Sequence, residues 1–222
     1  MIDTNAFFTE IKNNLALLCP DGLDSSDLIH IAESVLEKDI GTISVAPEHV
    51  DRLWAWLETS FTQIIARFVP EFSKDMDISD LSKQINSVFK KGASGAQVFI
   101  DVSRLPDLVS NLGSVRDDLF FNKTISIGLN MGDVMPNAWG DVFTCVGSLR
   151  ADALVLGFSG QSDKSSDFVG LVYGLINDLP DNMYPELHFM LGNDVSRIEQ
   201  VWRLFSQLRP DFLQKLKFFV NR

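Results

Sequence analysis

The sequence predicts a single α/β domain folded as a (β/α)8 barrel of the TIM type, on three observations. Short apolar segments alternate with segments of helical periodicity along the chain. Several of the apolar segments are almost continuously apolar, which is typical of parallel strands covered on both faces. About eight such segments are present, the number that closes a barrel of this type. The alternative, an open doubly wound sheet, is disfavoured because no Gly-x-Gly-x-x-Gly sequence opens a helix.

The expected strands are short and spread over the whole chain. They cover residues 15–18, 43–46, 63–68, 96–102, 124–129, 153–158, 187–191 and 216–220. The 222 residues are slightly fewer than the roughly 250 of a typical barrel, so the loops must be short. We expect one domain over 1–222, with a helix within 1–14 before the first strand. That helix or a partner would cover the seam between the last strand and the first.

Between the strands, apolar residues recur at the spacing of an amphipathic helix. Asp24 is placed to cap the first of these helices, and Gly41 follows its end. Pro47 suits the first position of the next helix, and Asp77 is placed to cap the third. Further helices are expected over 138–149, 168–179 and 198–208.

The charge balance excludes some classes of partner. Asp and Glu number 30 against 19 Lys and Arg, which gives a formal net charge of −11. Nucleic acids and anionic membranes would be repelled at long range by such a chain. We therefore expect no nucleic-acid partner and no membrane partner.

The cysteine and histidine content argues against a metal centre. Cys19 and Cys145 are the only cysteines, and the three histidines are far apart in the sequence. No spacing typical of a zinc site occurs, so we expect no metal, no cofactor and two reduced thiols. The N-terminus has neither a basic segment nor a long apolar run, which favours a cytoplasmic location.

Two segments near the N-terminus resemble a known enzyme family. Residues 17–22 read Leu-Leu-Cys-Pro-Asp-Gly, and residues 43–50 read Ile-Ser-Val-Ala-Pro-Glu-His-Val. They are similar to the N-terminal quarter of deoxyribose-phosphate aldolase, a class I aldolase barrel. Weaker similarity continues through 80–102 and at the Arg-Ala-Asp of 150–152, where the family has Gly-Ala-Asp before its catalytic strand. The resemblance implies a lyase fold that forms a Schiff base on a strand lysine.

The sequence departs from that family at its catalytic positions. The Schiff-base lysine would fall at Val155, or at Leu156 if the register slips, and the acid/base aspartate near Gln97. A second lysine of the family would lie on the strand at 187–191, which contains none. We therefore expect a divergent member without aldolase activity, a pseudoenzyme. A lysine ammonium inside the central cavity would contradict this interpretation.

Polar residues at the carboxyl ends of the strands are the remaining candidates for chemistry, since barrels carry their sites there. Asp101, His49 and Arg67 are the catalytic candidates. Asp101 could act as a general base if burial raised its pKa. The simpler interpretation is an ion pair of Asp101 with Arg67 or Arg104, and a solvated surface position for His49.

Two turns are candidates for binding a substrate phosphate. Ser159-Gly160 follows one strand, and Gly192-Asn193 precedes a helix, where backbone N–H groups could hold an oxyanion. Asp194 weakens the second candidate, because it brings a negative charge and is well placed to cap the helix itself.

Three functions follow from these observations. The first is a non-catalytic barrel that binds a small phosphorylated or carbonyl metabolite. The second is an active lyase or isomerase that acts on a sugar phosphate through Asp101, Arg67 and His49. The third is a structural or regulatory subunit that pairs with itself or with an active aldolase, which the off-stripe position of Trp56 suggests.

Overall fold

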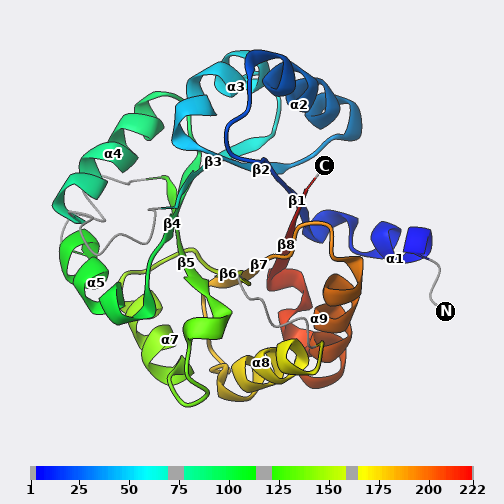
Figure 1. The fold of residues 1–222 in the computed structure, drawn as a ribbon, viewed down its shortest axis with the longest axis vertical. Coiled ribbons are helices and arrows are strands. Elements are labelled where there is room, and N and C mark those ends of the chain that lie inside the picture. Colours follow the sequence, from blue (N-terminus) through cyan, green and yellow to red (C-terminus); the bar gives the residue numbers. More distant parts are fainter. Residues whose placement is uncertain (1–3, 70–77, 114–121, 159–164, 222) are drawn as a thin grey trace.

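The eight strands of the chain close into a parallel barrel. The computed structural model describes residues 4–69, 78–113, 122–158 and 165–221. Each strand pairs with the next in the sequence, and β8 pairs with β1. Figure 1 looks down the barrel, with the strands as an inner ring and the helices outside it. The predicted fold class, a (β/α)8 TIM-type barrel, is confirmed.

The strands lie on the segments that the apolar pattern predicted. They are β1 Leu15–Leu18, β2 Thr42–Val45, β3 Gln63–Phe68, β4 Gly95–Phe99, β5 Thr124–Asn130, β6 Ala153–Gly157, β7 Glu186–Met190 and β8 Leu216–Asn221. The largest difference is in β4, which ends at Phe99 because a 3-10 turn begins at Val102.

The helices alternate with the strands. Those within the described residues are α1 Thr4–Glu10, α2 Ser25–Lys38, α3 Val50–Leu57, α4 Ile78–Lys90, α5 Leu105–Gly113, α7 Trp139–Ser148, α8 Ser165–Asp178 and α9 Val195–Leu208. Asp24 caps α2 in a capping box with Asp27, as predicted. Pro47 begins a 3-10 turn that leads into α3. We did not predict α5, and the expected cap Asp77 lies outside the described residues.

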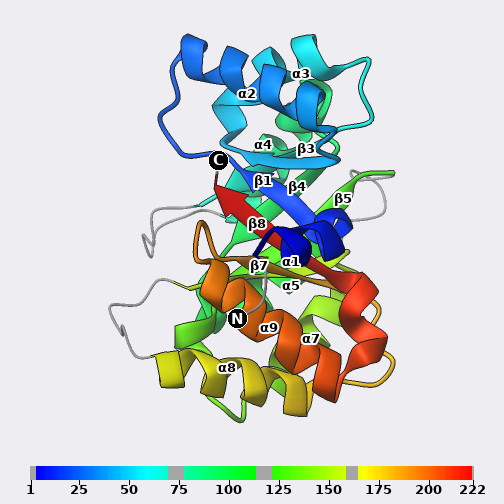
Figure 2. The ribbon, with the colours of Figure 1, turned by 90° about the vertical axis from the view of Figure 1, so that its right-hand side faces the viewer.

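The N-terminal helix covers the seam of the barrel. In Figures 1 and 2, α1 lies outside β1 and β8, next to α9. The side chains of Phe7 and Ile11 are buried in the core. Asn14 then donates hydrogen bonds to the carbonyl oxygens of Leu213 and Leu216, at 2.9 and 2.7 Å, and so holds this segment at the start of β8. The N-terminal segment is thus the element found over the seam.

The barrel interior is divided by a layer of side chains. Alternate residues of each strand point inward, and alternate strands contribute to one level. The register places Ser44, Gln97, Val155 and Phe219, all from even-numbered strands, at the same level. The hydroxyl of Ser44 donates to Oε1 of Gln97 at 2.7 Å within this layer. Cavities lie on both sides of it, one at the carboxyl ends of the strands and one at their amino ends.

Within the described part of the chain, the structure contains no helix with both the length and the apolar character needed to span a membrane.

Candidate functional site

The carboxyl ends of the strands enclose a cavity of about 380 Å³. Its walls are mostly apolar and come from different strands, with Leu18, Phe99, Leu129 and Met190 among them. Polar groups enter from Asp21, Arg67, Asn130 and Asn221. A largely apolar cavity with a few converging polar groups is the usual form of a small-molecule site.

Arg67 is the central charged group of this cavity. Its side chain is only 6% exposed, because β3 directs it into the barrel. Its Nη2 donates to Oδ1 of Asp21 at 2.6 Å and to the carbonyl oxygen of Cys19 at 2.9 Å. Its Nη1 lies 3.5 Å from the hydroxyl of Ser44. Asp21, by contrast, is 73% exposed, so the buried cation is neutralised by a carboxylate that solvent can reach.

A second cavity adjoins the first at Arg67. It has a volume of about 270 Å³, and its wall includes Asp21, Arg67 and Glu48. Arg67 therefore lines both cavities. A guanidinium has further N–H donors besides those bonded to Asp21, Cys19 and Ser44, and their planar arrangement suits carboxylate and phosphate oxygens. The arrangement can bind an anionic group at the carboxyl end of the barrel.

Asp101 does not pair with Arg67. Its side chain is exposed and accepts hydrogen bonds from the backbone N–H and the hydroxyl of Ser103, at 2.8 and 2.6 Å. These bonds, with a smaller contribution from the charge of Arg104, lower the pKa of Asp101. A raised pKa, the condition for the general-base hypothesis, is therefore contradicted. The expected ion pair with Arg67 is wrong as well, because Arg67 pairs with Asp21.

His49 is buried rather than solvated, so that expectation is wrong. It ends the 3-10 turn before α3, four residues ahead of the buried Leu53, and therefore lies on the inner face of the helix. Its Nε2 atom is buried and has no hydrogen-bond partner in the described structure. The structure thus gives Asp101, His49 and Arg67 three different environments, and it does not assemble them into one catalytic group.

The phosphate-binding turns are described only in part. Ser159 and Gly160 lie outside the described residues. Gly192 has a φ of +59°, and Asn193 beside it is exposed. Asp194 caps α9 by accepting from the N–H of Arg197 at 3.0 Å, as we expected. Phosphate binding at Gly192 and Asn193 stays a prediction.

Lys217 is the residue that we missed. It lies on β8 with the same inward parity as Phe219, and it lines the cavity at the amino end of the barrel. Its Nζ is 3.8 Å from Oε2 of Glu186. The expectation that no lysine ammonium lies inside the barrel is therefore wrong. Strict alternation along 216–220 could have revealed it, because Lys217 and Phe219 must share a face.

Lys217 is nevertheless separated from the carboxyl-end cavity. The register puts it below the layer that contains Val155 and Gln97, and none of the described residues that line the carboxyl-end cavity is a lysine. Val155 itself is fully buried. The two ends of the barrel are thus chemically different, with a guanidinium at one end and an ammonium at the other.

The two cysteines are free thiols. Cys19 is buried near Arg67, and burial raises its pKa to about 12 despite the opposing charge of Arg67. A thiol with such a pKa is a poor nucleophile at neutral pH. Among the described residues, no group of three or more His, Cys, Asp or Glu side chains is placed to hold a metal ion.

We expect the stability of the protein to fall as the pH drops from 7 to 5. The Nε2 of His188 bonds to Glu186 at 2.8 Å, but burial outweighs this bond and lowers the pKa of His188. Below its ordinary pKa of 6.5, the unfolded chain takes up a proton that the folded chain resists, which favours unfolding. Glu186, whose pKa is lowered by the same bond, adds a loss of the same sign below about pH 4.5. Urea unfolding at several pH values measures the free energy of unfolding and therefore both losses of stability.

The test variant is His188→Gln. It removes the titrating group, so the slope of stability against pH between pH 7 and 5 should become flatter. An unchanged slope in His188→Gln would contradict the assignment.

Comparisons with known proteins give the fold. No protein-family model and no curated protein matches the sequence. Solved structures do match, among them a proposed deoxyribose-phosphate aldolase from Toxoplasma gondii ME49, with a TM-score of 0.75, 15% identity and coverage of 98% of this chain and 91% of that chain. A proposed deoxyribose-phosphate aldolase from Coccidioides immitis matches with a TM-score of 0.69 and 9% identity, and the match covers 100% of this chain and 94% of that chain. The deoxyribose phosphate aldolase from Aeropyrum pernix matches with a TM-score of 0.70 and 10% identity, over 96% of this chain and 86% of that chain. Its structure is described as a unique tetramer. At these identities the likeness establishes an aldolase-like TIM-barrel fold.

Proposed function

We propose that this chain is a small-molecule-binding barrel that holds an anionic metabolite beside Arg67 and forms no imine with it. The observation that carries the proposal is the buried guanidinium between two cavities at the carboxyl end. Burying a cation is costly unless it is paired, and here its only carboxylate partner among the described residues is the solvent-reachable Asp21. A phosphate or carboxylate of a ligand can take the place of Asp21 and desolvate the pair fully.

The apolar walls of the carboxyl-end cavity determine the chemical character of the part of the ligand that does not contact Arg67. Phe99, Leu129 and Met190 surround the space next to Arg67 and offer few hydrogen bonds. Asn130 and Asn221 add amide groups at the rim, where a carbonyl or a hydroxyl could bind. The ligand class is therefore a short carbon chain with one anionic group and one further polar group, in line with the phosphorylated or carbonyl metabolite expected from the sequence.

The absence of imine chemistry is supported by Val155. The side chain at this position cannot attack a carbonyl, and the register puts Lys217 beyond the layer that Val155 belongs to. Fold similarity to aldolases does not decide whether this chain forms an imine, because one fold carries many activities. The proposal makes the chain a divergent, non-catalytic member of the aldolase-like barrels, and homo-oligomer formation stays a prediction.

We expect no covalent adduct beyond a slow background on surface lysines when the full chain is incubated with acetaldehyde and then reduced with sodium borohydride. An imine would be fixed as an ethyl group on a lysine, which mass spectrometry of the intact protein detects. Surface lysines give a slow background, so the comparison is the Lys217→Met variant. An adduct that forms rapidly in the natural sequence and disappears in Lys217→Met would overturn the proposal and establish Lys217 as a reactive amine.

We expect Asp21→Asn to tighten the binding of glycerol 3-phosphate by about three- to tenfold. The variant removes the carboxylate that competes with the ligand for Arg67, while the exposed position of residue 21 tolerates the change. Isothermal titration calorimetry measures the dissociation constant, and glycerol serves as the uncharged comparison ligand.

The control for this variant is Glu37→Gln, which removes the same charge from an exposed position on α2. It changes the net charge equally but lies outside the two cavities at Arg67. Equal tightening in both variants would show a general charge effect, and weaker binding in Asp21→Asn would make Asp21 part of the ligand site. Either result contradicts the proposed competition.

A further inference from the structure

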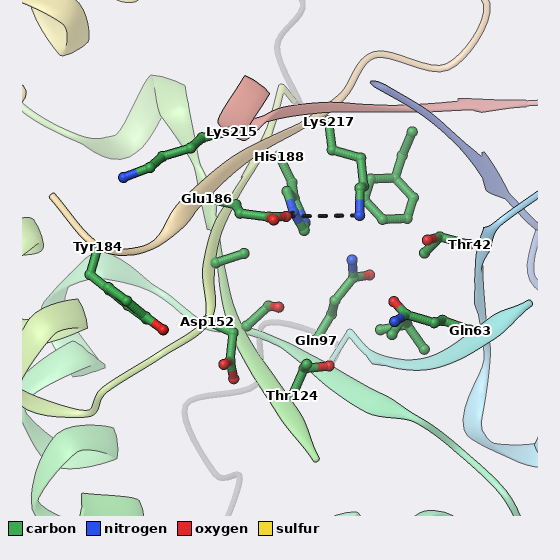
Figure 3. A pocket seen from close by; sticks show the side chains of 14 residues that line it. Thr42, Gln63, Gln97, Thr124, Asp152, Tyr184, Glu186, His188, Lys215 and Lys217 are labelled. Atoms are coloured by element: carbon green, nitrogen blue, oxygen red, sulfur yellow. Dashed lines mark hydrogen bonds and ion pairs between the residues drawn. The ribbon is translucent and has the colours of Figure 1, made fainter. Parts of the chain in front are cut away.

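The amino end of the barrel contains a cavity that the proposed function does not use. Its volume is about 390 Å³, within the range of small-molecule sites. Figure 3 shows polar side chains pointing into it from several strands. This end of a TIM barrel ordinarily serves stability rather than binding. A polar cavity of ligand size is therefore unexpected there.

The charges around this cavity cancel. Lys217 lies 3.8 Å from Glu186, and Lys215 donates to the carbonyl oxygen of Met183 at 2.8 Å. Asp152 accepts from the backbone N–H of Ile125 at 2.7 Å. Two ammonium groups and two carboxylates thus line the cavity, with a neutral His188 between them. The balance favours a neutral ligand over an anion or a cation.

The uncharged side chains can both donate and accept hydrogen bonds. They are the hydroxyls of Thr42, Thr124 and Ser126 and the amides of Gln63 and Gln97. Gln97 is almost fully buried, and its Oε1 is already bonded to Ser44. Its amide nitrogen faces the cavity on the side of Lys217 in Figure 3. Such a lining matches a ligand whose own groups both donate and accept, as hydroxyl groups do.

A second, independent observation that points to a ligand in this cavity concerns His188. Its side chain is more than nine-tenths buried in the wall of the cavity. Nε2 bonds to Glu186, and Nδ1 is buried with no partner in the described structure. An unpaired buried acceptor costs free energy, which a hydroxyl donor from a bound molecule would recover.

We propose that the amino end of the barrel is a second ligand site, for a neutral polyhydroxylated compound such as a free sugar or a polyol. The rings of Phe219 and Tyr184 supply apolar faces for the carbon skeleton. The hydroxyls of the ligand bond to Thr124, Ser126 and the amide of Gln97. The site is separate from Arg67 and does not depend on what binds there.

The test titrates D-glucose, xylitol and glycerol into the ¹⁵N-labelled full chain and follows the amide signals by NMR. We expect saturable shifts at the starts of β2, β5 and β8 with at least one of the three compounds. The dissociation constant should be on the order of millimolar, because a ligand of so few heavy atoms gains little binding free energy. No saturable shift with any of them, or shifts confined to the carboxyl end, overturns the proposal.

Two variants locate the site. Thr124→Val keeps the shape and removes one hydroxyl, and Lys217→Met removes the ammonium; each should weaken binding at least fivefold. Lys91→Met, at an exposed position just after α4, should bind as the natural sequence does. Should Lys217→Met fail to fold, Thr124→Val decides alone. Saturable shifts at these strands with sodium glutamate or sodium phosphate but with none of the three polyols would assign the cavity to a charged ligand and overturn the proposal.

Discussion

Arg67→Met is expected to weaken the binding of glycerol 3-phosphate at the carboxyl end of the barrel. Methionine fills a similar volume but offers no donor to an anion. A hydrogen bond to a charged group contributes about 1.5–3 kcal/mol, so the dissociation constant should rise by roughly 10- to 100-fold. The same variant leaves the carbonyl oxygen of Cys19 without its donor, which should lower the free energy of unfolding by about 1–3 kcal/mol.

Calorimetry and urea unfolding on one preparation separate the two effects of this change. Arg203→Met is the control, because Arg203 is exposed on α9 and outside both cavities at Arg67. It should change neither the affinity nor the stability. An unchanged affinity in a folded Arg67→Met protein would show that the anion does not bind at the guanidinium.

Phe189→Ala is expected to lower the free energy of unfolding by about 3–5 kcal/mol, the range for deleting a buried phenylalanine ring. Phe189 lies on the outer face of β7 and is completely buried. Its ring packs against Phe205 of α9 at 6.2 Å and against Phe218 of β8 at 6.0 Å, measured between ring centroids. The ring joins the barrel to its helical layer, so its loss leaves a cavity between them.

Urea unfolding of Phe61→Ala provides the comparison for this prediction. Phe61 is fully exposed in the turn before β3, so its replacement should change the free energy of unfolding by no more than about 0.5 kcal/mol. Similar values for the two variants would contradict the assignment of Phe189 to the core. Neither variant should alter the affinity for glycerol 3-phosphate, since neither residue lines the cavities at Arg67.

The strands and helix caps were predictable from the sequence because they depend on neighbouring residues. A buried parallel strand needs an apolar run such as 153–157, and that run is visible without knowing its partners. Asp24 and Asp194 cap helices through N–H groups three residues ahead, so their role is local as well. We did not predict helix α5, because we extended the preceding strand to residue 102.

The site depends on contacts between residues that are distant in the sequence. Arg67 and Asp21 are 46 positions apart, and Ser44 and Gln97 are 53 apart. Their pairing follows from strand order and register, which no local pattern encodes. Sequence patterns correctly indicated that Arg67 stands at the end of a strand, but they suggested Asp101 as its partner.

The amino-acid sequence by itself determined the barrel and the positions of its strands, because apolar periodicity is a property of the chain. The tertiary structure alone decided that Asp21 pairs with Arg67, that His49 is buried and that Lys217 meets Glu186 at the opposite end. The reason is physical. Burial and ion pairing depend on which faces meet when eight strands close with a particular stagger, and that closure is a property of the whole fold.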